Sequence, residues 1–178
     1  MNIYFITPFP ESIKILIENN ISNQGIKKKL IDVTIVNLRD FSDNEYKKID
    51  DEPYGGGSGM VMMPEPLFKS IDYCIEKCSD KPKIIFPSPK GKLLDHSTSE
   101  YLSKESSLIF ICGHYKGIDQ RVIDKYVDFE ISIGDYIISN GELSSMIIFD
   151  SIARLIPGVL NDLNSAMTDS FVDDLLDA

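Results

Sequence analysis

The chain has 178 residues, of which 43% are apolar and 26% are charged. This length and composition are typical of a single globular domain whose core needs no disulfides or metals for stability. The 28 acidic and 18 basic side chains give a net charge of −10. That balance argues against a surface dedicated to phosphate backbones, although a few local bases could still hold a nucleic acid.

Three features of the sequence concern location. No apolar run reaches the 18 residues of a membrane-spanning helix, and the N-terminal residues lack the basic stretch of a signal peptide. The cysteines Cys74, Cys78 and Cys112 are too few, and odd in number, for a disulfide framework. We therefore expect a reduced, cytoplasmic protein without a membrane partner.

The pattern of apolar residues predicts alternating strands and helices. Apolar and β-branched runs between turn signals predict strands at 2–7, 31–37, 83–86, 107–112 and 127–131. Apolar residues at helical spacing predict helices around 13–17, 67–78, 97–103, 118–126 and 143–156. Residues 38–63 are polar and then Gly-rich, which predicts a long loop, often a functional feature. The alternation predicts an α/β fold with a mostly parallel sheet.

The last predicted helix, 143–156, carries apolar residues on more than one face. Such a helix lies either in the centre of a domain or in a subunit interface. Ser139 and Glu142 are three residues apart just before it, the spacing of a capping box. The sequence therefore predicts that this pair begins the helix.

Three predicted strands in the second half are followed by Gly-containing segments, at 87–91, 112–119 and 132–136. Ligands of open parallel sheets bind beyond the carboxyl ends of the strands, and Gly lets the backbone approach a ligand closely. The three segments together predict a nucleotide-like pocket, although ordinary turns would have the same composition.

Other motifs exclude several kinds of chemistry. The Gly-rich stretch 54–60 lacks the Lys-Ser/Thr of a Walker A loop and the third Gly of a dinucleotide fingerprint. Cys74 and Cys78 lie one helical turn apart, but the only histidines are His96 and His114, so we predict no metal site. The Gly-x-Ser-x-Gly motif of a nucleophile elbow is not present.

The order of the motifs resembles that of the bacterial tRNA (guanine-N1)-methyltransferases, which methylate guanosine 37 of tRNA. The resemblance covers the chain from one end to the other, and the set of motifs is specific although each one alone is weak. The matching stretches include Arg39-Asp40-Phe41, Pro53-Tyr54-Gly55-Gly56-Gly57, Ser88-Pro89, Gly117-Ile118-Asp119, Ser132-Ile133-Gly134-Asp135-Tyr136, Gly141-Glu142-Leu143, Ile156-Pro157-Gly158-Val159 and Asp169-Ser170-Phe171.

This resemblance implies a SPOUT-class fold, in which the second half of a parallel sheet is tied in a deep trefoil knot. It also implies an obligate homodimer with each active site at the subunit interface. The knot loops would bind S-adenosylmethionine, largely through backbone groups. The donor-binding residues implied are Phe86, Pro87, Ser88, Pro89, Gly113, Tyr115, Lys116, Gly117, Ser132, Ile133, Gly134, Asp135, Tyr136, Ile137, Ile138, Asn140 and Gly141.

The resemblance assigns chemistry to two residues that would otherwise pass as a structural Arg and a loop acid. Asp169 would accept the proton of guanine N1 as general base, and Arg154 would stabilise the charge that grows on O6. Two positions depart from the family pattern. Lys116 stands where the family usually has a Glu that helps to place the methyl donor and magnesium, and Asn140 replaces a common Gly.

The resemblance also divides the chain. Residues 1–160 would be the knotted catalytic domain and 161–178 the start of an interdomain linker, with a C-terminal tRNA-binding domain missing from this chain. Three functions remain open at this point. They are an active tRNA methyltransferase, an S-adenosylmethionine-binding module with little methylation activity, and a nucleotide-binding α/β protein unrelated to methylation.

Overall fold

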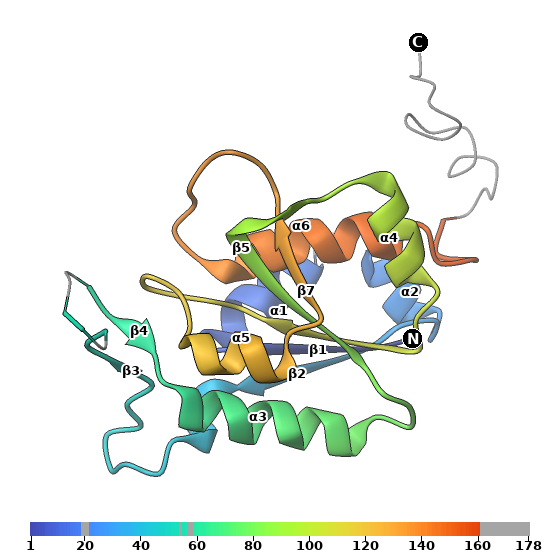
Figure 1. Cartoon of the computed structure of the whole chain (residues 1–178). Coiled ribbons are helices and arrows are strands. Elements are labelled where there is room, and N and C mark those ends of the chain that lie inside the picture. Colours follow the sequence, from blue (N-terminus) through green and yellow to red (C-terminus); the bar gives the residue numbers. More distant parts are fainter. Residues whose placement is uncertain (19–21, 54, 57–58, 161–178) are drawn as a thin grey trace.

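The structure is a computed structural model that describes residues 1–18, 22–53, 55–56 and 59–160 (Figure 1). Its centre is a parallel five-stranded sheet in the order β2-β1-β6-β5-β7. The strands are β1 (Asn2–Thr7), β2 (Asp32–Asn37), β5 (Lys83–Leu93), β6 (Ser107–Ile111) and β7 (Phe129–Ser132). A short antiparallel ribbon pairs β3 (Asp50–Asp51) with β4 (Val61–Met62). The predicted α/β class and parallel sheet are confirmed.

Helices cover both faces of the sheet (Figure 1). One layer contains α1 (Pro10–Glu18), α2 (Ser22–Lys27), α4 (His96–Ser103) and α6 (Gly141–Ala153), and the other contains α3 (Pro64–Lys77) and α5 (Gln120–Tyr126). The described helices include none with the length and apolar character needed to cross a bilayer. The sheet is therefore buried on both sides, as all-parallel sheets are.

Alternation along β1 shows how the sequence builds this core. Ile3 and Phe5 face one layer of helices, and Tyr4 and Ile6 face the other. The Phe5 ring stacks on Phe110 of β6 with the ring centroids 5.1 Å apart. Both faces of a central strand need apolar residues, which explains why its sequence is a continuous apolar run rather than an alternating one.

Helix α6 lies against the sheet, but part of its apolar surface is not covered in the single chain. Ile148, Phe149 and Ile152 are fully buried. Leu143 and Ile147, one turn apart, remain 43% and 41% exposed. The helix is thus a core element with an exposed apolar stripe, which is compatible with both positions that the sequence suggested.

Three local predictions are wrong. Strand β5 does not end at Phe86 but runs on to Leu93, and its pairing with β7 shifts register between Pro87 and Lys92. The stretch 38–63 is not one loop, because it holds a 3-10 helix (Leu38–Phe41) as well as β3 and β4. Helix α2 was not predicted at all; its sequence, Ser-Asn-Gln-Gly-Ile-Lys, lacks an apolar repeat. The trefoil knot stays a prediction.

The predicted capping box before α6 is also wrong. The side chain of Asn140, not of Ser139, accepts a hydrogen bond from the backbone N–H of Leu143 at 3.2 Å. Glu142 does not reach back to the cap, because its carboxylate is 1% exposed and has partners elsewhere in the fold. Asn is as good an N-cap as Ser, so the local sequence is compatible with two N-termini for helix α6, one residue apart.

Candidate functional site

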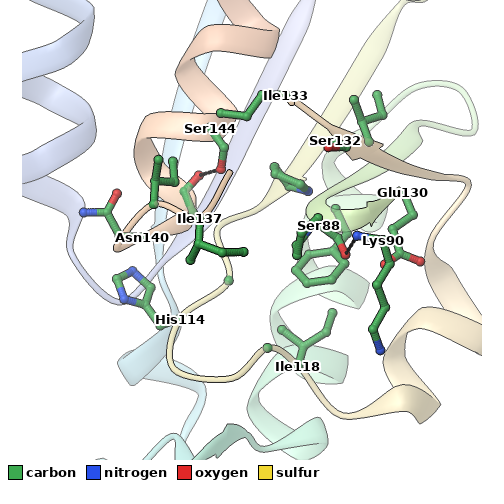
Figure 2. A pocket seen from close by; sticks show the side chains of 18 of the residues that line it. Ser88, Lys90, His114, Ile118, Glu130, Ser132, Ile133, Ile137, Asn140 and Ser144 are labelled. Carbon is green, nitrogen blue, oxygen red and sulfur yellow. Dashed lines mark hydrogen bonds between the residues drawn. The ribbon is translucent and has the colours of Figure 1, made fainter. Parts of the chain in front are cut away.

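A cavity of about 420 Å³ opens beside the irregular middle of β5 and at the carboxyl ends of β6 and β7 (Figure 2). Most of its walls come from four segments: 86–90 of β5, 113–118 after β6, 130–134 around the end of β7, and 136–141 leading into α6. Parallel strands bring their carboxyl ends to one edge of a sheet, which is where open α/β sheets bind ligands. The register shift in β5 turns the segment 87–91 out of regular pairing with β7 and into this wall.

The lining is mostly apolar with a few polar groups, the usual composition of a small-molecule site. Phe86, Ile118, Ile133 and Ile137 supply apolar surface from the four different segments. Polar side chains also line the cavity, namely Ser88, Lys90, Gln120, Glu130, Ser132, Ser139 and Ser144.

Glycine allows two walls of the cavity to approach each other closely. The Gly141 N–H donates a hydrogen bond to the Gly113 carbonyl at 2.8 Å. A Cβ on Gly113 would lie 2.8 Å from a ring carbon of Phe86, closer than real Cβ atoms come. A side chain at position 113 would therefore displace the aromatic wall.

The segment after β6 is fixed to β4 by backbone hydrogen bonds. Lys116 N–H donates to the Met60 carbonyl at 3.0 Å, and Met62 N–H donates to the Gly117 carbonyl at 3.0 Å. Tyr115, directly before Lys116 and Gly117, is in the left-handed region with φ of 59°, which is unfavourable for a bulky residue. Such strain persists only where the surroundings hold the backbone in place.

Lys116 connects the cavity to the Gly-rich stretch. A Cβ on Gly59, where φ is +100°, would lie 2.9 Å from Cε of Lys116 and 3.1 Å from its Cγ and Cδ. The aliphatic stem of Lys116 therefore packs on the bare backbone of Gly59. Gly59 therefore serves as a surface for a neighbouring side chain.

A buried polar cluster lies beside the cavity. The Glu142 carboxylate contacts His114 Nε2 at 2.7 and 2.8 Å, and it accepts a hydrogen bond from the Thr7 hydroxyl at 2.5 Å. The exposed fractions of the His114 and Glu142 side chains are 12% and 2%. The two carboxyl oxygens of Glu142 can accept hydrogen bonds from both the Thr7 hydroxyl and an Nε2–H of His114.

The comparisons with known proteins agree with this geometry. The sequence profile of the family described as "tRNA (Guanine-1)-methyltransferase TrmD" matches residues 1–178, the whole chain. The chain belongs to this tRNA methyltransferase family. It is similar to the "tRNA (guanine-N(1)-)-methyltransferase" of Clostridioides difficile, with 44% identity over 99% of this chain and 77% of the relative. The protein of that name from Methylacidiphilum infernorum is 46% identical over 99% of this chain and 76% of its own length.

A solved structure from the same family has the same fold. The tRNA (m1G37) methyltransferase of Aquifex aeolicus superimposes with a TM-score of 0.83 at 39% sequence identity, over 91% of this chain and 72% of that chain. The fold class expected from the sequence, that of a SPOUT methyltransferase, is therefore confirmed.

The cavity contains almost all the residues that the sequence assigned to the methyl donor in this tRNA methyltransferase family. Asp135 is the exception, since it does not line the cavity. Further lining residues, such as Ile123 and Ser144, lie on helices α5 and α6 and are not among those expected from the sequence. Ser144 lies one turn after Gly141, so helical spacing from a predicted residue could have identified it.

The two residues predicted to be catalytic in the methyltransferase reaction are not part of this cavity. Arg154 is the C-cap of α6 and lines a second cavity of about 390 Å³, together with Leu16, Leu143, Met146, Ile147, Asp150 and Ser151. Asp169 lies outside the described residues.

Two of the cysteines, Cys74 and Cys112, are buried in the core and offer no reactive thiol. Burial raises the pKa of Cys74 to about 12. Burial, and to a smaller extent the nearby Glu142 carboxylate, raises the pKa of Cys112 further. Both thiols are therefore protonated at neutral pH, and only the thiolate is a strong nucleophile. Among the described residues, no three His, Cys, Asp or Glu side chains come together as metal ligands.

Proposed function

We propose that the chain transfers a methyl group from S-adenosylmethionine to N1 of guanosine 37 in tRNA. The observation that carries this proposal is the cavity between the middle of β5 and the carboxyl ends of β6 and β7, in a chain that belongs to the tRNA (guanine-N1)-methyltransferase family. Relatives that are 44–46% identical bear the name tRNA (guanine-N(1)-)-methyltransferase. Position 37 is proposed because the solved relative from Aquifex aeolicus is a tRNA (m1G37) methyltransferase.

The residues of the cavity fit S-adenosylmethionine. A volume of about 420 Å³ is in the range of sites for small organic ligands. Phe86, Ile118 and Ile133 provide apolar surface for an adenine ring, and Gly113 and Gly117 add no side chain to the wall, so a ligand can approach the backbone closely there. When bound, S-adenosylmethionine supplies an electrophilic methyl group on a positively charged sulfur.

The nucleophile in this reaction needs activation, because N1 of guanine carries a proton at neutral pH. In our proposal the Asp169 carboxylate accepts that proton while the new N1–C bond forms and the S–C bond breaks. As the proton leaves N1, negative charge grows on guanine O6, and the Arg154 guanidinium stabilises it there until the methyl group has been transferred. The products are 1-methylguanosine, S-adenosylhomocysteine and a proton.

A homodimer explains how Arg154 can act at the donor cavity. The N-terminal residue of α6, Gly141, lines that cavity, and Arg154 caps the other end of the 13-residue helix. At 1.5 Å per residue the two ends are about 20 Å apart, farther than a side chain reaches. We therefore propose that Arg154 serves the cavity of a second subunit, and that the exposed Leu143 and Ile147 lie in the interface.

The side chain at position 116 does not suit a magnesium ion. A cationic Lys116 lines the cavity at the position of the family's usual Glu. An ammonium repels a divalent cation, but it can pair with the carboxylate of the donor. Any magnesium requirement of this protein would then depend on groups other than the side chain at position 116, including groups of the tRNA substrate.

Titration calorimetry tests the donor half of the proposal. We expect S-adenosylmethionine and S-adenosylhomocysteine to bind with one molecule per chain, and ATP to bind far more weakly. ATP shares the adenosine moiety but carries a triphosphate, and this cavity has no Walker loop to hold it. Equal binding of ATP would favour a general nucleotide-binding protein, and no binding of S-adenosylmethionine would contradict the proposal.

A further inference from the structure

Glu142 carries a carboxylate that is buried but does not belong to the proposed chemistry of methyl transfer. Its side chain is 2% exposed, and it lies in the first turn of α6. A buried charge is costly unless it is paired and hydrogen-bonded. Here the partners are the Thr7 hydroxyl at 2.5 Å and His114 Nε2 at 2.7 Å.

These contacts tie together three segments that are distant in the sequence. Thr7 ends β1, His114 follows β6, and Glu142 begins α6. The His114 ring also packs on Phe9, with ring centroids 4.9 Å apart, and the Thr7 hydroxyl oxygen accepts the Phe9 N–H at 2.9 Å. We call Thr7, Phe9, His114 and Glu142 the Glu142 brace.

Two of the braced segments are walls of the proposed donor cavity. The segment 113–118 lines it on one side and the segment 136–141 on another, and His114 itself is part of the lining (Figure 2). In Figure 2 the His114 ring lies below Asn140, at the point where these two walls approach each other. A change in the pairing of His114 and Glu142 would therefore alter the separation of the walls.

The backbone next to the brace needs such support. Tyr115 is in the left-handed region with φ of 59°, and it lines the cavity directly after His114. Its conformation is unfavourable for a bulky residue and persists only if its neighbours are held. Backbone hydrogen bonds hold Lys116 and Gly117 on one side, and the His114 side chain is the anchor on the other.

We propose that His114 and Glu142 are positioning residues that set the shape of the S-adenosylmethionine site. The proposal rests on the proposed function, since it concerns the same cavity. His114 acts through its Nε2–H, which fixes the segment 113–118 against the start of α6. The Phe9 ring keeps the imidazole in the plane that this hydrogen bond requires.

Two substitutions of His114 separate the hydrogen bond from the packing. His114→Gln places an N–H donor near the position of Nε2 but loses the ring that packs on Phe9. His114→Phe keeps the ring but leaves the buried Glu142 carboxylate without its nitrogen partner. An unpaired buried carboxylate costs more free energy than the loss of ring packing in His114→Gln. The double variant His114→Phe with Glu142→Gln removes the uncompensated charge.

The experiment is a calorimetric titration with S-adenosylmethionine of the wild-type chain and these three variants, with the thermal midpoint of each recorded. We expect His114→Phe to weaken donor binding by about tenfold or more, and His114→Gln to bind within about threefold of the wild type. The double variant should bind no more weakly than His114→Phe alone, because paired residues are not additive.

The outcomes distinguish this proposal from the one on which it rests. If the wild-type chain does not bind S-adenosylmethionine, the proposed function fails. If the wild type binds and His114→Phe binds equally well, the positioning role is overturned, whatever happens to the thermal midpoint. Stronger binding by His114→Phe than by His114→Gln would also overturn it, because packing and not the hydrogen bond would then shape the site.

Discussion

A Cβ on Gly141 would lie 2.3 Å from the backbone nitrogen of Gly113 and 2.7 Å from its carbonyl oxygen. The start of α6 and the segment after β6 thus touch backbone to backbone, and both line the proposed donor cavity. If either backbone segment moves to make room for a side chain, a wall of that cavity moves with it. The smallest side chain at position 141 should therefore affect ligand binding as well as stability.

We predict that Gly141→Ala lowers the free energy of unfolding by about 1–3 kcal/mol, the usual cost of overpacking a tight contact. It should also weaken S-adenosylmethionine binding by about tenfold or more, because a loss of about 1.4 kcal/mol in binding free energy corresponds to a factor of ten. Denaturant unfolding and titration calorimetry measure the two effects. Lys81→Ala, at an exposed position away from the cavity, is the control and should change neither quantity.

The exposed stripe of α6 predicts a dimer. Leu143 and Ile147 are each more than 40% exposed on a helix that is otherwise buried. We expect light scattering to give twice the chain mass for the wild type and the single-chain mass for Ile147→Lys, because a charge in an apolar interface is not solvated. Tyr73→Lys, on the opposite layer of helices, should remain dimeric. A monomeric wild type at micromolar concentration would refute the inter-subunit role of Arg154.

Lys116 should limit the use of a divalent cation. Two unit charges about 4 Å apart at an effective dielectric near 20 interact by roughly 4 kcal/mol before desolvation. Partial exposure reduces this, but a remainder of about 1.4 kcal/mol is still a tenfold effect. We therefore expect Lys116→Glu to raise methyl transfer, and its dependence on magnesium, severalfold. Single-turnover methylation across a magnesium titration measures this, and superimposable curves for the two proteins would show that position 116 does not govern metal use.

Asp169 should be essential to the chemical step but not to donor binding. Asp169→Asn keeps the shape of the side chain and removes the base. We expect the rate of methyl transfer to fall by about 10²–10⁴, the usual range for general base catalysis. S-adenosylmethionine affinity, measured by calorimetry, should change little. A variant with near-normal turnover would assign the role of base to another group.

The N-cap of α4 provides a pH-dependent contribution to stability. The Asp95 side chain accepts the Thr98 N–H at 2.7 Å. The hydrogen bonds from Thr98, followed by those from Lys92 and Ser97, hold the pKa of Asp95 well below its usual range. A carboxyl whose pKa is lowered by folding stabilises the protein above its unfolded pKa of about 3.9, and the contribution is lost as the pH falls toward the folded value.

We therefore expect Asp95→Ala to lower the free energy of unfolding by about 1 kcal/mol at pH 7. The difference from the wild type should shrink below about pH 4, where the Asp95 carboxyl takes up a proton in the unfolded chain but not yet in the folded protein. Asp95→Asn keeps an acceptor at the N-cap without a charge. Its free energy of unfolding should therefore fall less than that of Asp95→Ala, and should depend less on pH than that of the wild type. Chemical denaturation of the three proteins from pH 3 to pH 7 is the measurement, and a constant difference for Asp95→Ala across this range would contradict the account.

The position of the cavity at one edge of the sheet was predictable from the sequence, because the parallel direction of the strands alone determines this edge. Once the strands alternate with helices, the segments after β6 and β7 must meet at the same edge. The bulged part of β5 was assigned correctly to this region but wrongly placed beyond the end of a strand. Pro87 and Pro89 are signals for a strand end, and they are tolerated here because the pairing with β7 is irregular between Pro87 and Lys92.

The role of Glu142 could not be predicted from local spacing. Its distance of three residues from Ser139 is that of a capping box, and a capping box is a local motif. The actual partners, Thr7 and His114, are 135 and 28 residues away in the sequence. Only the three-dimensional arrangement of β1, β6 and α6 brings them together. The separation of Arg154 from the donor cavity was likewise not predictable without the length and direction of α6.

Analysis of the methylated nucleoside tests the central claim most directly. The chain would be incubated in excess over tRNA with S-adenosylmethionine that is isotopically labelled in its methyl group, and the tRNA then digested to nucleosides. The account predicts labelled 1-methylguanosine from a tRNA with guanosine at position 37, and none from the same tRNA with adenosine at that position. Donor binding without any labelled nucleoside, or a label at another position of guanine, would contradict it.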